Sequence, residues 1–214
     1  MKISTEVSVD KLRGGFYSPD ALVDVCLDRV FELAGGREQL KALEPSAGDG
    51  GFVRGLARHP LGGHVGAVDA VEIVPAEAAK TRDVLNDAGL PGRVLNGSVL
   101  DPTLLDQGYD VAIGNPPFVR FQFVSAEDRA HIDELGGKVG VPFKGVSNLW
   151  IPVLLTALSH LRDGGVFSFI IPAECFTGLS ARAVRTWLGQ HATQLRVDLF
   201  PPKSFPGVLQ EVVI

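Results

Sequence analysis

The stretch LEPSAGDGGF at residues 43–52 decides the fold class of this 214-residue chain. An apolar segment ends there in an acid, and a glycine-rich turn then opens a helical pattern. Glycines supply positive φ and let the backbone approach a ligand closely. In doubly wound parallel sheets, ligands lie at the carboxyl ends of strands, where such turns stand. The stretch predicts a strand, a turn at a ligand site and a helix. Nicotinamide and flavin enzymes use similar turns, so the turn alone leaves the ligand open.

Segments with strand and helix patterns alternate along the rest of the chain. Helical periodicity covers 19–34, with Ser18 as N-cap and Pro19 in the first turn. Further helices are expected near 52–59, 75–88, 147–161 and 180–190, and Ser147 is expected to cap the third of these. Strands are expected near 40–43, 64–72, 93–96, 109–114, 166–171 and 195–200, with the start of another at 211–214. The alternation predicts one α/β domain over 1–214 with a parallel, doubly wound sheet.

Two parts of the chain fall outside this alternation. Residues 115–146 show no clear period, and a loop of that length in a compact domain is usually functional or mobile. The apolar run at 211–214 has no polar tail, so we expect the chain to be a fragment of a longer protein. The alternative is a C-terminal strand that simply ends the protein.

The composition is that of an ordinary globular protein, with 45% hydrophobic and 21% charged residues, which excludes a disordered chain. The formal net charge is −5, so a broad basic face for nucleic acid is not expected. Contact with nucleic acid must then use a local patch or surface outside this chain. The cysteines and histidines lack metal-ligand spacing, so no metal site is expected. The start lacks a signal peptide, and the longest apolar stretch is too short to span a bilayer. A cytoplasmic protein without a membrane partner is expected.

A second acid carries information about the ligand. Glu72 closes an apolar strand pattern 22 residues after Gly50. An acid at about this spacing, at the end of the second strand, is placed to bind ribose hydroxyls. The two features together predict a cofactor that carries a nucleoside.

The tetrapeptide Asn115-Pro116-Pro117-Phe118, which follows an apolar strand, indicates the chemistry. Each proline fixes its own φ and holds the preceding residue extended. The Asn115 side-chain carbonyl and the Pro116 backbone carbonyl can then point at one spot and accept both hydrogens of a planar amino group. This draws the nitrogen towards tetrahedral geometry and frees its lone pair to attack a sulfonium methyl group, so no strong base is required. Phe118 offers a flat face on which an aromatic ring can stack.

These motifs resemble those of the S-adenosylmethionine-dependent DNA methyltransferases of the adenine-N6, gamma type, in which target recognition is C-terminal. The resemblance covers about Gly14 to Ile214. It implies a class I, Rossmann-like methyltransferase domain, with a seven-stranded mixed sheet and helices on both faces. It also implies a target-recognition domain beyond Ile214. The implied reaction transfers a methyl group from S-adenosylmethionine to adenine N6 of double-stranded DNA, with the base flipped out. The implied setting is restriction–modification or phage defence, in which a partner subunit can take part.

The resemblance also assigns roles to individual residues. The sequence FYSP at 16–19 matches an N-terminal cofactor motif that spans 14–34, and residues 115–146 match the catalytic loop. The cofactor contacts implied by the family are Tyr17, Ser18, Pro19, Glu44, Pro45, Ser46, Ala47, Gly48, Gly50, Phe52, Glu72, Ile73, Ser98, Val99 and Asn115. The implied catalytic residues are Asn115, Pro116, Pro117 and Phe118. Phe118 and Phe205 would hold the target base from two sides, and SNLW at 147–150 resembles the helix start that follows the mobile loop.

The chain departs from the family at Ser98, where an Asp that accepts from the cofactor's adenine usually stands. Ser98 can also accept a hydrogen bond, but it carries no charge. Asp101 could substitute only if the loop turned. We therefore expect somewhat weaker cofactor binding.

The tetrapeptide leaves several alternatives open. Glutamine methyltransferases that act on release factors and some ribosomal RNA methyltransferases carry the same motif. Cytosine N4 is a further target, although it more often accompanies Ser or Asp in place of Asn115. A non-catalytic module that binds S-adenosylmethionine, or a nicotinamide-dependent enzyme, would leave the tetrapeptide unexplained.

Overall fold

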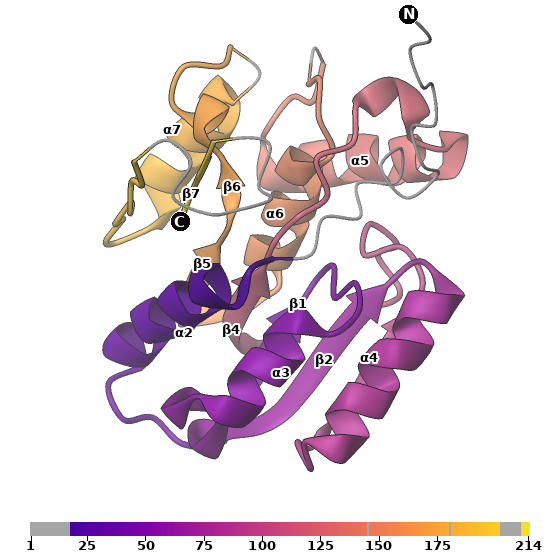
Figure 1. Cartoon of the computed structure of the whole chain (residues 1–214). Coiled ribbons are helices and arrows are strands. Elements are labelled where there is room, and N and C mark those ends of the chain that lie inside the picture. The colour runs from indigo at the N-terminus through magenta and orange to yellow at the C-terminus, as the bar shows by residue number, and fades with distance from the viewer. Residues whose placement is uncertain (1–17, 145, 180, 202–210) are drawn as a thin grey trace, which may run out of the picture.

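A five-stranded parallel sheet with the order β3-β2-β1-β4-β5 forms the centre of the structure, a computed structural model (Figure 1). The structure describes residues 18–144, 146–179, 181–201 and 211–214. The strands are β1 (Leu40–Glu44), β2 (Val65–Glu72), β3 (Gly92–Asn96), β4 (Tyr109–Gly114) and β5 (Leu161–Phe169). The predicted doubly wound α/β architecture is confirmed for this sheet.

Helices cover both faces of the sheet (Figure 1). On one face lie α2 (Asp20–Ala34), α3 (Gly51–Arg58) and α4 (Pro75–Asp87), and α6 (Trp150–Ser159) packs on the other. Helix α5 (Ala126–Val139) packs on α6, and α7 (Arg182–His191) lies near β6 and β7 and contributes Val184 to the same hydrophobic cluster as α6. Short 3-10 helices occur at Pro60–His64, Phe121–Phe123 and Ala173–Cys175. All six residues of β4 are buried, as expected for a strand covered on both sides.

The strand order places a topological switch point between β1 and β4. The chain moves from β1 outward to β2 and β3, then returns to the other side of β1 to form β4. The turns that follow β1 and β4 therefore diverge at the carboxyl ends of these strands, which is where open α/β sheets bind ligands. Glu44 ends β1 and Gly114 ends β4, so the glycine-rich stretch and the tetrapeptide both lie at this point.

The prediction of a seven-stranded mixed sheet is not confirmed. A separate two-stranded antiparallel sheet pairs β6 (Ile171–Pro172) with β7 (Val212–Val213). One further hydrogen bond extends this contact, from the Ala173 N–H to the Glu211 carbonyl at 2.9 Å. The strand predicted at 195–200 is reduced to one antiparallel bridge, between Leu199 and Val213. Leu199 is 71% exposed, so little burial holds that segment in a regular strand.

The predicted boundaries at the end of the main sheet also need correction. Strand β5 begins at Leu161 rather than near 166, because Leu161 already pairs with Tyr109. The pairing register then shifts before Val111 pairs with Val166.

Helix α5 corrects the prediction that residues 115–146 lack regular structure. The Ser125 side chain accepts a hydrogen bond from the Asp128 N–H at 3.0 Å, and Gly140 ends the helix with φ 69°. Ile132 is the one buried residue of this helix, so its apolar periodicity is too weak to read. A serine followed three residues later by an acid was the available signal.

Two predicted helix caps are also wrong. Pro19 occupies the N-cap position of α2, and no side chain caps that end, so Ser18 is not the cap. Helix α6 starts at Trp150 with Leu149 at the N-cap position, so Ser147 lies too early to cap it. The hydroxyl of Ser18 instead serves the site described below. In the part of the chain that the structure describes, no helix is both long and apolar enough to span a membrane.

Candidate functional site

Two hydrogen bonds hold the glycine-rich turn after β1 against β2 and α4, and Gly50 packs closely against α4. The Ala47 N–H donates to the Val71 carbonyl at 2.8 Å, and the Thr81 hydroxyl donates to the Gly48 carbonyl at 2.8 Å. Gly50 takes φ 86° at the start of α3, and a Cβ there would lie 3.3 Å from the Thr81 Cα. Glycine is required at this position for both its conformation and its size.

Glu72 ties the end of β2 to this turn. Its Oε2 accepts from the Gly48 N–H at 2.9 Å, and its Oε1 accepts from the Val74 N–H at 2.7 Å. Burial raises the pKa of Glu72, while these N–H donors oppose the rise. Each carboxylate oxygen has a second lone pair, so the side chain can still accept from a ligand hydroxyl.

Glu44 presents a buried acceptor without a partner. The residue is 2% exposed, and its Oε2 has no hydrogen-bond partner among the described residues. Burial raises the pKa of Glu44 well above its ordinary value, and the nearby carboxylates of Asp49 and Glu72 add to the rise. A cationic group placed beside Glu44 would satisfy this oxygen and favour its ionised form.

Asn115 is held from two directions. Its Nδ2 donates to the Ser18 hydroxyl at 3.1 Å, and its backbone carbonyl accepts from the Ser46 hydroxyl at 3.1 Å. Its Oδ1 is buried and has no partner among the described residues. A buried carbonyl oxygen without a donor is costly, so this atom is a strong candidate to meet a substrate donor.

A short antiparallel contact fixes the chain that follows the tetrapeptide. The Phe121 N–H donates to the Ser147 carbonyl at 2.9 Å, and the Leu149 N–H donates to the Val119 carbonyl at 2.8 Å. The predicted SNLW segment therefore lies beside residues 119–121, which follow the tetrapeptide directly. Phe118 is partly buried between the cores of the two sheet faces.

Asp128, which is not among the predicted site residues, lies beside Ser98. The Ser98 hydroxyl donates to Asp128 Oδ1 at 2.5 Å, and the Ser125 hydroxyl donates to Asp128 Oδ2 at 2.9 Å. Asp101 instead accepts from the backbone N–H and the hydroxyl of Thr103, so it does not replace the family's acid. The carboxylate nearest Ser98 comes from α5, a helix that the sequence did not reveal.

The fold brings most predicted site residues to the carboxyl ends of β1 to β4. Several of them have side chains that are buried, which leaves only their backbone to meet a ligand: Pro45, Ala47, Phe52, Val99 and Pro116. Ile73 is 59% exposed, so its side chain is available to a ligand. The predictions for Tyr17 and Phe205 lie outside the described residues.

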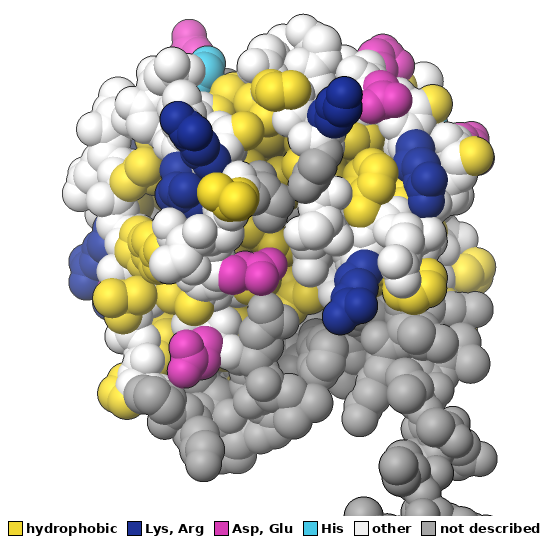
Figure 2. Space-filling model, turned by 90° about the horizontal axis from the view of Figure 1, so that it is seen from above, with side chains coloured by type: hydrophobic (Ala, Val, Ile, Leu, Met, Phe, Trp, Pro, Cys, Tyr) yellow, Lys and Arg dark blue, Asp and Glu magenta, His cyan; other side chains and the backbone are white. Residues whose placement is uncertain are grey.

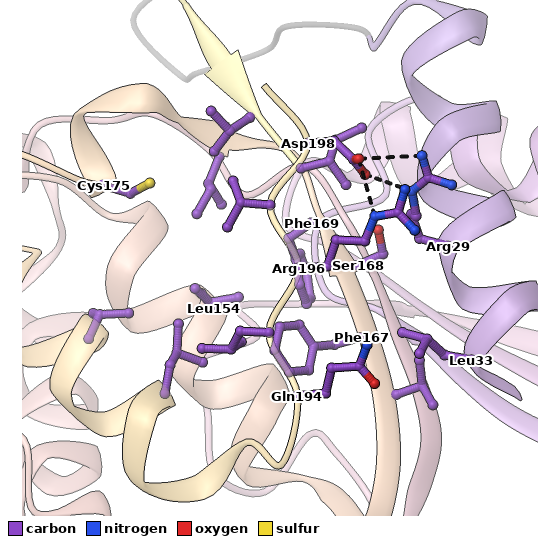
Figure 3. Close-up of a pocket in the computed structure, with 18 of the residues that line it drawn as sticks. Arg29, Leu33, Leu154, Phe167, Ser168, Phe169, Cys175, Gln194, Arg196 and Asp198 are labelled. Carbon is purple, nitrogen blue, oxygen red and sulfur yellow. Dashed lines mark hydrogen bonds and ion pairs between the residues drawn. The ribbon is translucent and has the colours of Figure 1, made fainter. Parts of the chain in front are cut away.

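A cavity of about 650 Å³ lies at a different place, between β5 and residues 193–198 (Figure 3). Asp198, which lines the cavity, forms ion pairs with Arg29 of α2 at 2.7 Å and with Arg196 at 3.4 Å. Arg29 lowers the pKa of Asp198. Cys175 lines the cavity, but burial raises the pKa of its thiol and so makes it less reactive. The predicted site residues that the structure describes do not line this cavity.

The charges on the visible surface are dispersed. Figure 2 shows Lys and Arg side chains separated by hydrophobic ones, with acidic side chains among them. Among the described residues in this view there is no continuous basic stripe.

The sequence profile of the Eco57I restriction-modification methylase family matches residues 79–204, more than half of the chain. The chain belongs to this family. The matched range includes β4 and the tetrapeptide that follows it, but begins after the glycine-rich turn and Glu72.

Similar proteins agree with this membership. The Type II methyltransferase M.BanIII of Aneurinibacillus aneurinilyticus is 25% identical over 228 residues, which cover 95% of this chain. The match covers 38% of M.BanIII, so the chain spans about two-fifths of that relative's length. The resemblance to restriction–modification methyltransferases inferred from the motifs is confirmed.

Solved structures establish the fold. A Listeria monocytogenes protein assigned to the class I S-adenosylmethionine-dependent methyltransferases superimposes with a TM-score of 0.75 at 15% identity. That match covers 98% of this chain and 61% of the Listeria protein. The methyltransferase subunit of a type I restriction-modification system from Streptococcus thermophilus gives a TM-score of 0.72 at 19% identity, covering 93% and 44% of the two chains. The class I methyltransferase fold is therefore confirmed.

Proposed function

We propose that this chain is the catalytic domain of a methyltransferase that transfers a methyl group from S-adenosylmethionine to adenine N6 in DNA. The observation that supports the proposal is the buried Oδ1 of Asn115, directly after β4, which has no partner among the residues that the structure describes. This acceptor lies at the switch point of a class I methyltransferase fold, in a chain of the Eco57I restriction-modification methylase family.

The residues at this switch point fit the cofactor. Glu44 offers its unpartnered oxygen to the ammonium group of the methionine part, and Glu72 offers spare lone pairs to the ribose hydroxyls. Ile73 offers an exposed apolar side chain to the adenine ring. S-adenosylmethionine supplies a methyl group on a positively charged sulfur, which a nitrogen lone pair can attack. Ser98 and the backbone of the glycine-rich turn complete the proposed cofactor site.

Asn115 prepares the amino group that receives the methyl group. Its Oδ1 and the Pro116 carbonyl would each accept one amino hydrogen, which moves the nitrogen lone pair out of conjugation with the ring. The attacking nitrogen forms one N–C bond as the S–C bond breaks, and it then loses one proton to solvent. Phe118 would stack against the base. Adenine N6 lies within the base stack of duplex DNA, so the base must be flipped out to reach Asn115.

The charge of this chain limits how it holds DNA. Its net charge is −5, whereas phosphate contacts from basic side chains supply much of the affinity of DNA-binding proteins. We propose that a target-recognition domain outside this chain supplies most of the DNA contacts. The setting we propose is restriction–modification or a related defence system, with or without a partner subunit.

The decisive experiment uses the full-length protein, S-adenosylmethionine labelled in the methyl group, and unmethylated DNA that is afterwards digested to nucleosides. Label in N6-methyldeoxyadenosine is the expected result. Label in N4-methyldeoxycytidine would keep the reaction class and overturn the target base. Label in RNA or in a protein glutamine, but not in DNA, would overturn the DNA proposal.

A further inference from the structure

The side chain of Ser18 lies at the start of α2, far from the tetrapeptide in sequence but in contact with it in the fold. The Asn115 Nδ2 donates to the Ser18 hydroxyl at 3.1 Å, across a separation of 97 residues. Pro19 follows with φ −56°, and the helix begins at Asp20 without using Ser18 as a cap. The hydroxyl is therefore available to Asn115.

The orientation of the Asn115 amide decides whether it can receive an amino group. One end of the amide is a carbonyl acceptor and the other is an NH₂ donor. If the amide turned by 180°, it would set its own hydrogens against those of the incoming amino group. In the structure the NH₂ end is taken by Ser18, and the carbonyl oxygen is the end without a partner among the described residues.

The backbone of Asn115 is held independently of its side chain. The Ser46 hydroxyl, from the glycine-rich turn, donates to the Asn115 carbonyl at 3.1 Å. This contact fixes where the residue lies but leaves the side-chain amide free to turn. The contact with Ser18 holds that amide, and in the structure it engages the NH₂ end and leaves Oδ1 to meet an incoming donor.

We propose that Ser18 is a positioning residue that anchors the Asn115 amide through Nδ2, which leaves Oδ1 to face the amino group to be methylated. This inference rests on the proposed function, because it assumes that Asn115 accepts from a substrate amine. It also gives Ser18 a role apart from the cofactor contact that the family resemblance implies. The segment that begins α2 and the segment that ends β4 then form one unit at the site.

The test compares Ser18→Ala, which removes the acceptor, with Ser18→Thr, which keeps it. Ser159→Ala is the matched control, because that hydroxyl also makes a hydrogen bond, to the Thr156 carbonyl at 2.8 Å, but lies at the end of α6. Three quantities are measured on the full-length protein: the single-turnover rate of methyl transfer at saturating cofactor, the dissociation constant of S-adenosylmethionine, and the side-chain amide NMR signals of Asn115 without cofactor.

We expect Ser18→Ala to lower the single-turnover rate roughly tenfold, the effect of losing one hydrogen bond, and to shift the Asn115 amide signals. Ser18→Thr and Ser159→Ala should retain rates within about twofold of the wild type, since neither removes the acceptor. An unchanged rate and unchanged amide signals in Ser18→Ala, with a weaker dissociation constant alone, would overturn the inference and leave Ser18 as a cofactor contact.

The proposed function and the positioning role of Ser18 can be refuted separately. A wild-type protein that methylates no DNA would overturn the proposed function, while the amide signals would still report whether Ser18 holds Asn115. Conversely, a wild type that methylates adenine N6 normally, together with a Ser18→Ala variant of unchanged rate, would overturn the positioning role alone.

Discussion

Replacing Gly50 by alanine tests how the glycine-rich turn is built. Gly50 has φ 86°, a conformation that costs an L-residue about 1 kcal/mol or more. The added Cβ would also lie 3.3 Å from the Thr81 Cα and 3.3 Å from the Val84 Cβ, both on α4. Because one of these contacts is backbone, α4 itself must shift, and such overpacking costs about 2 kcal/mol.

The two costs add to about 3 kcal/mol, which should lower the Tm by about 6–12 °C in a chain of this size. The assay is thermal unfolding followed by circular dichroism. Gly36→Ala is the matched control, because Gly36 has φ 75° but nothing lies within 4 Å of the added Cβ. That variant should lose about 1 kcal/mol and about 2–4 °C. Equal losses in the two variants would refute the role assigned to crowding against α4.

Three further predictions follow from the site. First, burial raises the pKa of Glu44, so the stability that its neutral form contributes is complete below the ordinary pKa and is lost as pH rises through the pKa of the folded state. The Tm of Glu44→Gln should therefore rise relative to that of the wild type as pH rises from 5 to 9. Parallel plots of Tm against pH for the two proteins would contradict this. Second, Asn115→Ala should lower single-turnover methyl transfer by at least about 100-fold, as for loss of a catalytic hydrogen-bonding group, while isothermal titration still detects S-adenosylmethionine binding; retained turnover would point to another acceptor. Third, Ser98→Asp removes the hydroxyl that donates to Asp128 and sets a second carboxylate against it. Loss of a hydrogen-bond partner costs about 1–2 kcal/mol, so the Tm should fall by roughly 2–8 °C and recover when Asp128→Asn is added. A stable single variant would show that Asp128 can move away.

Local sequence patterns predicted most of the helices and strands of the fold. The run at 109–114 is apolar except for Asp110, and such a run is typical of a strand buried on both faces. Helix α5 was not predicted, because Ile132 is its one buried residue and the sequence there shows no amphipathic pattern. At 195–200 the sequence has β propensity, but the segment pairs only through the bridge between Leu199 and Val213, because propensity alone does not supply a neighbouring strand.

The sequence by itself determined the alternation of elements, the glycine-rich turn, the acid at Glu72 and the tetrapeptide at 115–118. These are local features, since each depends on residue types a few positions apart. Only the tertiary structure decided that Ser18 holds the Asn115 amide, that Glu72 braces Gly48, and that Asp128 meets Ser98. Hydrogen bonds between residues 24 to 97 positions apart leave no periodic pattern in the sequence, because the packing of helices on the sheet sets the distances between their atoms.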